Sequence, residues 1–421
     1  MKSSRRTSLT IKYNGRNVTT ALNEFLENFQ YIDVASGEAD TLDLVLSDDE
    51  HRWINSWFPV EGDYVEAKIN VHDWLKRGDN RSLNCGRFYV DDYGYNGPGD
   101  VANIGSITKP VDSDFSKTEK NKTWKNTTLE GIAKIIAKSA GVALYYEAPN
   151  YKIANNEQSG QTDMNFLFDL CSNYCLAMKL YNQKIVIFDE VKYEEKPPKY
   201  VIDKSYCKSY TPHTTLAGMY DGVKISYTNT KNNKTLHYKY MINKSGKRIL
   251  SVKEKADSYA DAEVIAKSKL RAANKSSTTL SITVMGDVKY VAGNCAEITG
   301  FAKFNGKYYI DKVTHELSEG YTCTLEMHKT LGITVGAELF GKNKVYQNGK
   351  HEIGDTYAVV TSLTGYYTAV EAKNNKSSGN PTGRVNKGKY YVFNYHVKTG
   401  MINVTKVKGV PGSWINPSKN N

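Results

Sequence analysis

The sequence has little cysteine: six residues in 421, scattered along the chain. Only Cys171 and Cys175 are close together, and their spacing of four differs from the C-x-x-C of redox and zinc sites. No histidine lies near enough in sequence to complete a set of ligands. We therefore expect no metal site and no disulfide framework, but reduced thiols in or beside cores, as in a protein made in a cytoplasm.

Long apolar runs are also absent. No segment approaches the ~20 uninterrupted apolar residues that a membrane helix needs. The N-terminal residues include Lys2, Arg5 and Arg6, but no apolar segment follows them as in a secretory signal. The sequence therefore predicts a protein without a membrane segment.

Familiar catalytic motifs are missing as well. His315-Glu316 has no second histidine four residues on, and neither a nucleophile elbow nor a phosphate-binding loop is found. A nucleophilic pair of Cys207 and His213 is conceivable, but nothing in the sequence supports it. We predict a non-enzymatic protein without cofactors.

Charge is unevenly distributed along the chain. The 56 Lys and Arg residues exceed the 45 Asp and Glu residues, for a formal net charge of +11. The lysines stand singly among Asn, Gly and Thr, and no nucleic-acid-binding motif accompanies them. We therefore predict a solvated surface without specific nucleic-acid binding, while weak attraction to an anionic cell wall stays open. Most of the excess lies in residues 341–421, with 12 basic and three acidic residues.

Hydrophobic periodicity divides the chain. Period-two alternation, clearest at Val65–Val71, predicts strands in residues 1–110, whereas residues 112–128 are polar and read as a loop or linker. Helical spacing then predicts a helix from Leu129 to Gly141 and a second one over Met164–Met178. Strands are expected over Val142–Tyr146 and Lys184–Phe188, a helix over 257–274, and further strands between 222 and 327.

These patterns predict a mainly β fold with an α+β insert. We expect two β regions, a helix-containing module between them, a linker, and a small C-terminal β unit. Their expected ranges are 1–115 and 199–335 for the two β regions, 116–198 for the module, 336–355 for the linker and 356–421 for the C-terminal unit.

Several stretches occur in a characteristic order, with weak individual motifs but distinctive spacing. The first opens a helix, the second is a polar lead-in to an acidic helix cap and a strand, and the third runs from a helix into glycine-punctuated strands. They are Thr128–Ala133; Gln158–Leu167 with Lys184–Phe188; and Asp261–Leu270 with Gly293, Gly300, Phe301, Lys307–Leu317 and Gly320–Glu326.

This order, over roughly residues 1–330, resembles the late control protein D family of phage tail and baseplate hub proteins. It is also similar to the N-terminal part of VgrG spike proteins of contractile secretion systems. The resemblance implies a homotrimer whose duplicated tail-tube-like barrels adapt the hexameric tail tube to the trimeric central spike. The implied partners are the tail tube protein, the spike protein, the tape-measure protein and other baseplate proteins. The implied location is a virion tail or tail-like particle assembled in the host cytoplasm.

The C-terminal unit has a resemblance of its own. The stretches Thr364–Ala369, Gly383–Val385, Gly388–Val392, Gly400–Thr405 and Pro411–Pro417 look like the SH3-like barrels of phage tail proteins and lysins. Such domains can bind peptidoglycan through exposed aromatic side chains. The implied candidates are Tyr366, Tyr367, Tyr390, Tyr391 and Trp414.

An alternative for these aromatics is core packing, with alternate members of each tyrosine pair, and Trp414, filling a small interior. The alternative function for the whole chain is a cell-wall-binding protein acting through this unit. A peptidoglycan hydrolase is a third and weaker reading.

Overall fold

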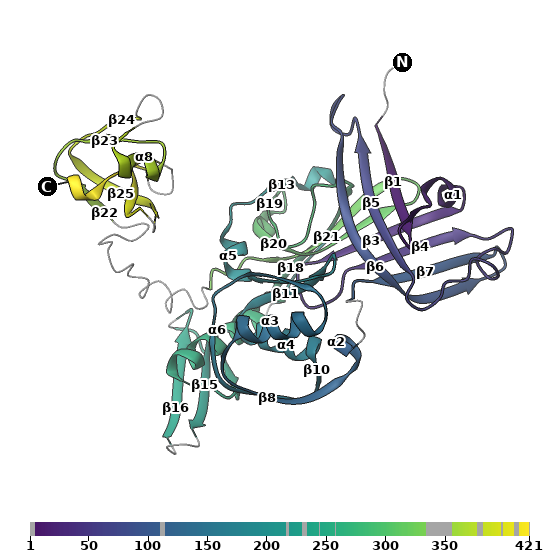
Figure 1. Cartoon of the computed structure of the whole chain (residues 1–421), viewed down its shortest axis with the longest axis horizontal. Coiled ribbons are helices and arrows are strands. Elements are labelled where there is room, and N and C mark those ends of the chain that lie inside the picture. The colour runs from purple at the N-terminus through teal and green to yellow at the C-terminus, as the bar shows by residue number, and fades with distance from the viewer. Residues whose placement is uncertain are drawn as a thin grey trace. The chain divides into compact units, whose positions relative to one another are not determined.

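The computed structural model describes residues 5–109, 114–215, 219–229, 234–243, 245–256, 258–333, 356–376, 382–396, 399–407 and 412–420. The chain forms two compact units, Met1–Gly336 and Ala337–Asn421. The fold is mainly β, as the sequence predicts (Figure 1). The expected linker at 336–355 lies outside the described residues.

Seven strands and a short helix form the N-terminal part of the first unit. The strands follow one another in space as β3-β4-β7-β6-β5-β1-β2, with neighbours antiparallel. The period-two pattern is realised in β4, where Leu42, Leu44 and Leu46 are buried and the residues between them face the other side. The elements are β1 (Arg6–Tyr13), β2 (Arg16–Asn17), α1 (Thr19–Asn23), β3 (Leu26–Val34), β4 (Thr41–Ser47), β5 (Tyr64–His72), β6 (Arg81–Asn96) and β7 (Val101–Ile107).

Six later strands extend the same sheet. Strand β20 pairs with β3 in antiparallel register, from Lys312 opposite Val34 to Leu317 opposite Phe29. The two β regions therefore form one sheet of 13 strands and share one apolar core. The added strands are β13 (Tyr200–Asp203), β14 (Cys207–Thr214), β18 (Thr278–Met285), β19 (Cys295–Thr299), β20 (Gly306–Leu317) and β21 (Tyr321–Lys329), with short 3-10 turns at Lys204–Tyr206 and Ala302–Phe304.

The helical module lies between the two halves in sequence. Helices α3 and α4 begin where Thr128 and Thr162 accept hydrogen bonds from backbone N–H groups three residues on. The module consists of α2 (Asp114–Lys117), β8 (Glu119–Thr128), α3 (Leu129–Ser139), β9 (Ala143–Glu147), β10 (Lys152–Thr162), α4 (Asp163–Asn173), β11 (Leu176–Tyr181), β12 (Lys184–Asp189) and α5 (Glu190–Glu195).

Two local predictions in this module were wrong. Residues 112–128, expected as a loop, include strand β8, which pairs with β10. Both strands are mostly polar in sequence, and Trp124 and Ile153 are their only buried apolar side chains, so neither has the apolar alternation that marks a strand. The second expected helix, Met164–Met178, ends at Asn173, because Cys175 adopts a left-handed φ of 55° and the chain continues as β11.

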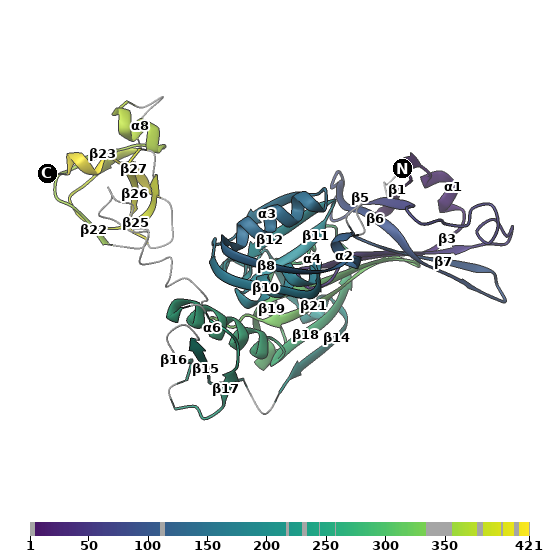
Figure 2. The ribbon, with the colours of Figure 1, turned by 60° about the horizontal axis from the view of Figure 1, so that its bottom comes forward.

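A small satellite sheet interrupts the second β region. Strands β15 (Gly222–Asn229), β16 (Lys234–Met241) and β17 (Ile249–Val252) form it, and helix α6 (Tyr259–Lys275) covers it. Figure 2 shows α6 beside these strands, at a distance from β3 and β7. Their shared core has Val223, Ile225, Tyr238, Ile265 and Leu270 among its buried residues.

The second unit is a compact β structure with a single α-helix among its described residues. Four strands pair in the order β22-β25-β26-β27, and β23 pairs with β24. The elements are β22 (Thr356–Val359), β23 (Leu363–Gly365), α8 (Ala369–Asn374), β24 (Gly383–Val385), β25 (Gly388–His396), β26 (Met401–Thr405), β27 (Ser413–Ile415) and a 3-10 turn at Pro417–Lys419. None of the helices in the described parts of the chain is long and apolar enough to cross a membrane.

Candidate functional sites

The 13-stranded sheet has one apolar and one polar face. Opposite the shared core, cross-strand neighbours form rows of side chains that are half-buried, or exposed in the case of Asp92, and many of them are hydroxyl, amide or carboxylate groups. One row runs Thr283, Thr324, Thr314, Ile32, Thr41 and Ile107, and the next runs Thr322, Glu316, Gln30, Asp43, Gly105 and Asp92. Such a face can contact water or a passing polar chain without strong apolar adhesion.

Carboxylates make part of this polar face acidic. Partial burial, followed by the nearby charge of Asp92, raises the pKa of Asp43 above its usual value. Gly105 lies between the two, since a Cβ built there would lie 3.3 Å from the Asp92 Cβ and 3.5 Å from the Asp43 Oδ1. Among the described residues neither carboxylate has an ion-pair partner.

Both ends of the sheet present open backbone edges. At one end β14 pairs with β18, and no other described strand pairs with β14. At the other end β2 covers β1 only at Lys12 and Tyr13. Unpaired edges of this kind are templates for pairing with another chain.

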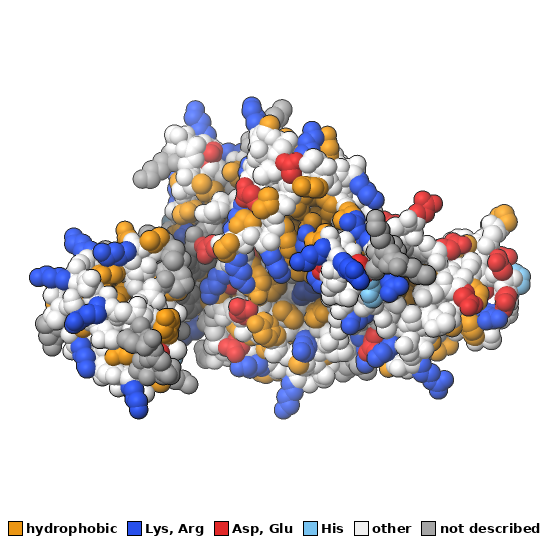
Figure 3. Space-filling view, turned by 90° about the horizontal axis from the view of Figure 1, so that it is seen from above, with side chains coloured by type: hydrophobic (Ala, Val, Ile, Leu, Met, Phe, Trp, Pro, Cys, Tyr) orange, Lys and Arg blue, Asp and Glu red, His pale blue; other side chains and the backbone are white. Residues whose placement is uncertain are grey.

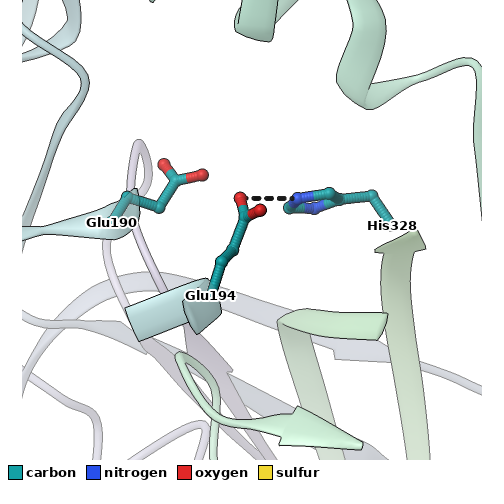
Figure 4. A group of neighbouring side chains, drawn as sticks. All are labelled: Glu190, Glu194 and His328. Atoms are coloured by element: carbon teal, nitrogen blue, oxygen red, sulfur yellow. Dashed lines mark hydrogen bonds and ion pairs between the residues drawn. The ribbon is translucent and has the colours of Figure 1, made fainter. Parts of the chain in front are cut away.

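A buried cluster of charges joins three parts of the first unit. Figure 4 shows Glu190 and Glu194 of α5 directed toward His328 of β21. The Nε2 of His328 lies 3.2 Å from the Glu194 Oε1, and its Nδ1 lies 2.8 Å from the Asp311 carboxylate. Arg271 of α6 forms an ion pair with Glu194.

The charged groups of this cluster stabilise one another in their ionised forms. Burial lowers the pKa of His328, but the Asp311 carboxylate and the bond to Glu194 outweigh it and raise the pKa to about 9. Burial likewise opposes ionisation of Glu194, yet the His328 hydrogen bond and the Arg271 charge hold its pKa at about 2. Both groups are therefore charged at neutral pH.

The cluster also has the donor set of a metal site. One ligand atom from each of Glu190, Glu194 and His328 lies within 4.8 Å of the others. However, Arg271 and Lys275 already form ion pairs with the two glutamates, and both nitrogens of His328 are engaged. The cations in place neutralise the carboxylates, so the arrangement fits an ionic clamp better than an ion-binding site.

The aromatic residues expected to bind cell wall lie in different environments. Tyr366 and Tyr390 are buried in cores of the second unit, whereas Tyr367 is 69% exposed and Tyr391 is half-buried. Trp414 is half-buried and packs beside the small core that contains Tyr366. The backbones of Tyr366 and Trp414 exchange two hydrogen bonds of 2.9 Å, so the structure brings these two together.

The conceivable nucleophilic pair is not brought together. Cys207 and His213 lie six residues apart along β14, which corresponds to roughly 20 Å in a strand. The other five thiols are buried, and burial raises the pKa of each; in Cys295 it rises to about 11.

The sequence analysis missed Glu194, Arg271 and His328. Glu194 is separated from Arg271 by 77 positions and from His328 by 134 positions. No local pattern of spacing connects residues so far apart, and their pairing depends on the tertiary fold.

Solved structures with a similar fold are phage tail proteins. A tail protein from Neisseria meningitidis MC58 aligns with a TM-score of 0.59 and 13% identity, covering 78% of this chain and 97% of that one. The 43 kDa tail protein of prophage MuSo2 from Shewanella oneidensis gives 0.56 and 12%, with coverages of 77% and 98%. Prophage tail protein gp18 from Listeria monocytogenes EGD-e gives 0.51 and 13%, with coverages of 75% and 92%.

At these identities the likeness establishes the fold, which is that of phage tail proteins. The YQBQ-like family model matches residues 115–328, half of the chain, and the chain belongs to that family. No curated protein matches the sequence. The finer resemblance to the late control protein D family stays a prediction, as does the SH3-like character of the second unit.

Proposed function

We propose that this protein is a non-enzymatic hub in the tail or baseplate of a phage or tail-like particle. In this proposal it is a homotrimer that adapts the hexameric tail tube to the trimeric central spike. The observation that carries the proposal is the joined sheet, in which two β regions of one chain meet at β3 and β20. Three such chains supply six β regions around a ring, which matches a sixfold partner on one side and a threefold partner on the other.

The open edges and the polar face fit this assembly. Edges β14 and β1 are available for contacts between protomers, and closing a ring leaves no edge exposed. The polar rows on the second face then line a central passage for the tape-measure protein. In the same proposal residues 1–115 and 199–335 are the tube-like barrels, and 116–198 is the insert module. The likeness to tail proteins supports a location in the virion tail, among other baseplate proteins.

The proposal is tested by the solution mass of the purified chain. Light scattering at several concentrations should give a mass near three times 47.2 kDa. Electron microscopy of the same sample should then show a ring with pseudo-sixfold density. A mass of one protomer at every concentration would contradict self-assembly into a hub.

A second candidate function belongs to residues 356–421, proposed as an SH3-like accessory domain that binds peptidoglycan. The observation that favours it is the exposed ring of Tyr367, two residues before α8, because aromatic faces stack on sugars and peptides. Purified cell walls should retain the full chain in a pull-down, and Tyr367→Ala should weaken retention. Val407→Ala, which removes an equally exposed apolar side chain elsewhere in the unit, is the matched control.

A further inference from the structure

A hollow of about 570 Å³ lies at one end of the first unit. Helix α1, the turn between β1 and β2, and the segment 48–63 form its walls. Its size is within the ~300–1,000 Å³ typical of binding sites. The wall residues are largely apolar and aromatic, and they include Val18, Leu22, Trp53, Trp57 and Phe58, with Arg16 and Asp63 among the polar ones.

The segment 48–63 is held in place at both ends. The buried Asp48 carboxylate accepts backbone N–H bonds from Arg52 and Trp53 at 2.7 and 3.0 Å. Near the other end, Asp63 accepts the Tyr13 hydroxyl at 2.6 Å and the Val60 backbone N–H at 2.9 Å. The hollow therefore exists before any partner arrives, which lowers the entropic cost of binding.

Acidic residues outnumber basic ones around the hollow, in contrast to the positive net charge of the whole chain, although Arg16 lines the hollow and Arg52 lies over the Trp57 ring. Glu50, Glu61 and Asp91 each form an ion pair, with Arg52, Lys117 and Lys109 respectively. Between residues 48 and 63 there are five acidic residues and a single basic one, Arg52. Figure 3 shows acidic side chains gathered at the right-hand end, with hydrophobic ones among them. The exposed acidic residues of this end are Glu24, Glu27, Asp49, Glu50, Glu61, Asp91 and Asp92, and the exposed apolar ones are Ile54, Phe58 and Val60.

We infer that this hollow and its acidic rim are a docking site for a basic peptide segment of another protein. The segment inserts one bulky apolar side chain between Trp53, Trp57 and Phe58. Its flanking Lys or Arg side chains contact the acidic rim. Aromatic walls with complementary charge at the rim are the usual composition of such anchor sites.

The inference rests on the proposed hub function and adds to it a binding site for a partner protein on each protomer. Its test uses the isolated chain and a defined peptide, so a failure here leaves the mass measurement untouched. The probe is a peptide with one leucine flanked on each side by glycine and two lysines. The protein is labelled with 5-fluorotryptophan, which gives one fluorine resonance for each of its five tryptophans.

Peptide addition should shift the resonances of Trp53 and Trp57, assigned through Trp53→Phe and Trp57→Phe. The resonances of Trp124 and Trp414 should stay in place, because neither residue lines the hollow. Fluorescence anisotropy of the labelled peptide should show a dissociation constant that rises at least several-fold at high salt.

Two control peptides make the inference refutable. Replacing the leucine by glycine removes the anchor, and replacing the lysines by glutamates reverses the charge; each should raise the dissociation constant at least tenfold. Equal affinity of the glycine control, or equal shifts at all five tryptophans, would reduce the interaction to general electrostatic attraction and overturn the inference. In Phe58→Ser the affinity should fall, whereas in Val201→Ser, a change at an exposed apolar site on β13, it should not.

Discussion

Replacing Arg271 by methionine should open the junction between α6 and the main sheet. The side chain of Arg271 is 1% exposed, and it forms ion pairs with Glu194 and Glu190. Its Nη1 also donates a 2.8 Å hydrogen bond to the carbonyl of Ile333. Methionine retains the apolar stem but leaves the two buried carboxylates with one cation fewer.

Breaking a buried ion pair by removing one partner costs about 3–5 kcal/mol, because the remaining charge is neither solvated nor paired. The assay is native-state hydrogen exchange of α6 amides, read by mass spectrometry on the full chain. This readout reports local opening and does not require two-state unfolding of a protein with two units. Since ~1.4 kcal/mol corresponds to a factor of ten, exchange should accelerate roughly 10²- to 10⁴-fold.

Two variants decide whether the cause is the unpaired charge. Lys269→Met, on the same helix, removes a partly exposed ion pair with Glu254. It should change the free energy of local opening by less than about 1 kcal/mol. Adding Glu194→Gln to Arg271→Met should recover part of the loss, because it removes a stranded carboxylate. An Arg271→Met variant that exchanges like the wild type, or a double variant that loses the sum of both single effects, would refute the reasoning.

Three further predictions follow from the same structure. The pKa of His328 is raised from 6.5 to about 9, so its contribution to the free energy of unfolding is full below pH 6.5 and is lost as pH rises through 9. The pKa of Glu194 is lowered to about 2, so its contribution to the same free energy is lost only as pH falls below 4.5. Urea unfolding at several pH values should show this alkaline loss, up to about 3 kcal/mol, and His328→Gln should flatten it. Tyr367→Ala should leave the unfolding temperature nearly unchanged, whereas Tyr366→Ala, at a core position, should cost roughly 3–5 kcal/mol in the second unit. A thiol reagent at pH 8 should modify Cys207 first, because the other five thiols are buried.

The sequence predicted elements whose burial pattern is local. Alternation at Val65–Val71 identified β5, and helical spacing identified α3 and the start of α4. The strands β8 and β10 were not predicted, because each has only one buried apolar side chain, Trp124 or Ile153, and a single one gives no period to detect. In the Tyr366–Tyr367 pair one ring is buried and the other exposed, which agrees with the alternative of core packing for Tyr366, while wall binding by Tyr367 stays a prediction.

The candidate sites depended more on tertiary contacts. The ionic clamp draws residues from α5, α6 and β21, and the hollow beside Trp53 forms from three segments that meet only after folding. The 13-stranded sheet likewise depends on the pairing of β3 with β20, residues almost 300 positions apart in sequence. Local propensity carries no information about such a pairing, which is decided by complementary edges and a shared core.

Charge is unevenly distributed along the chain, which the net charge of +11 does not show. Residues 341–421 carry 12 basic and three acidic residues, whereas the rim of the Trp53 hollow is acidic. An anionic wall polymer therefore suits the second unit, and a basic peptide suits the first. Heparin, a soluble polyanion, should compete with cell walls for the chain. It should not change the fluorine shift that the lysine–leucine peptide causes at Trp53, when the shift is compared at equal concentrations of peptide that is not bound to heparin. Excess polylysine should suppress the fluorine shift of Trp53, because it competes with the peptide for the acidic rim. If heparin abolished the Trp53 shift as well as cell-wall binding, the two surfaces would not be electrostatically distinct, and net charge alone would account for both.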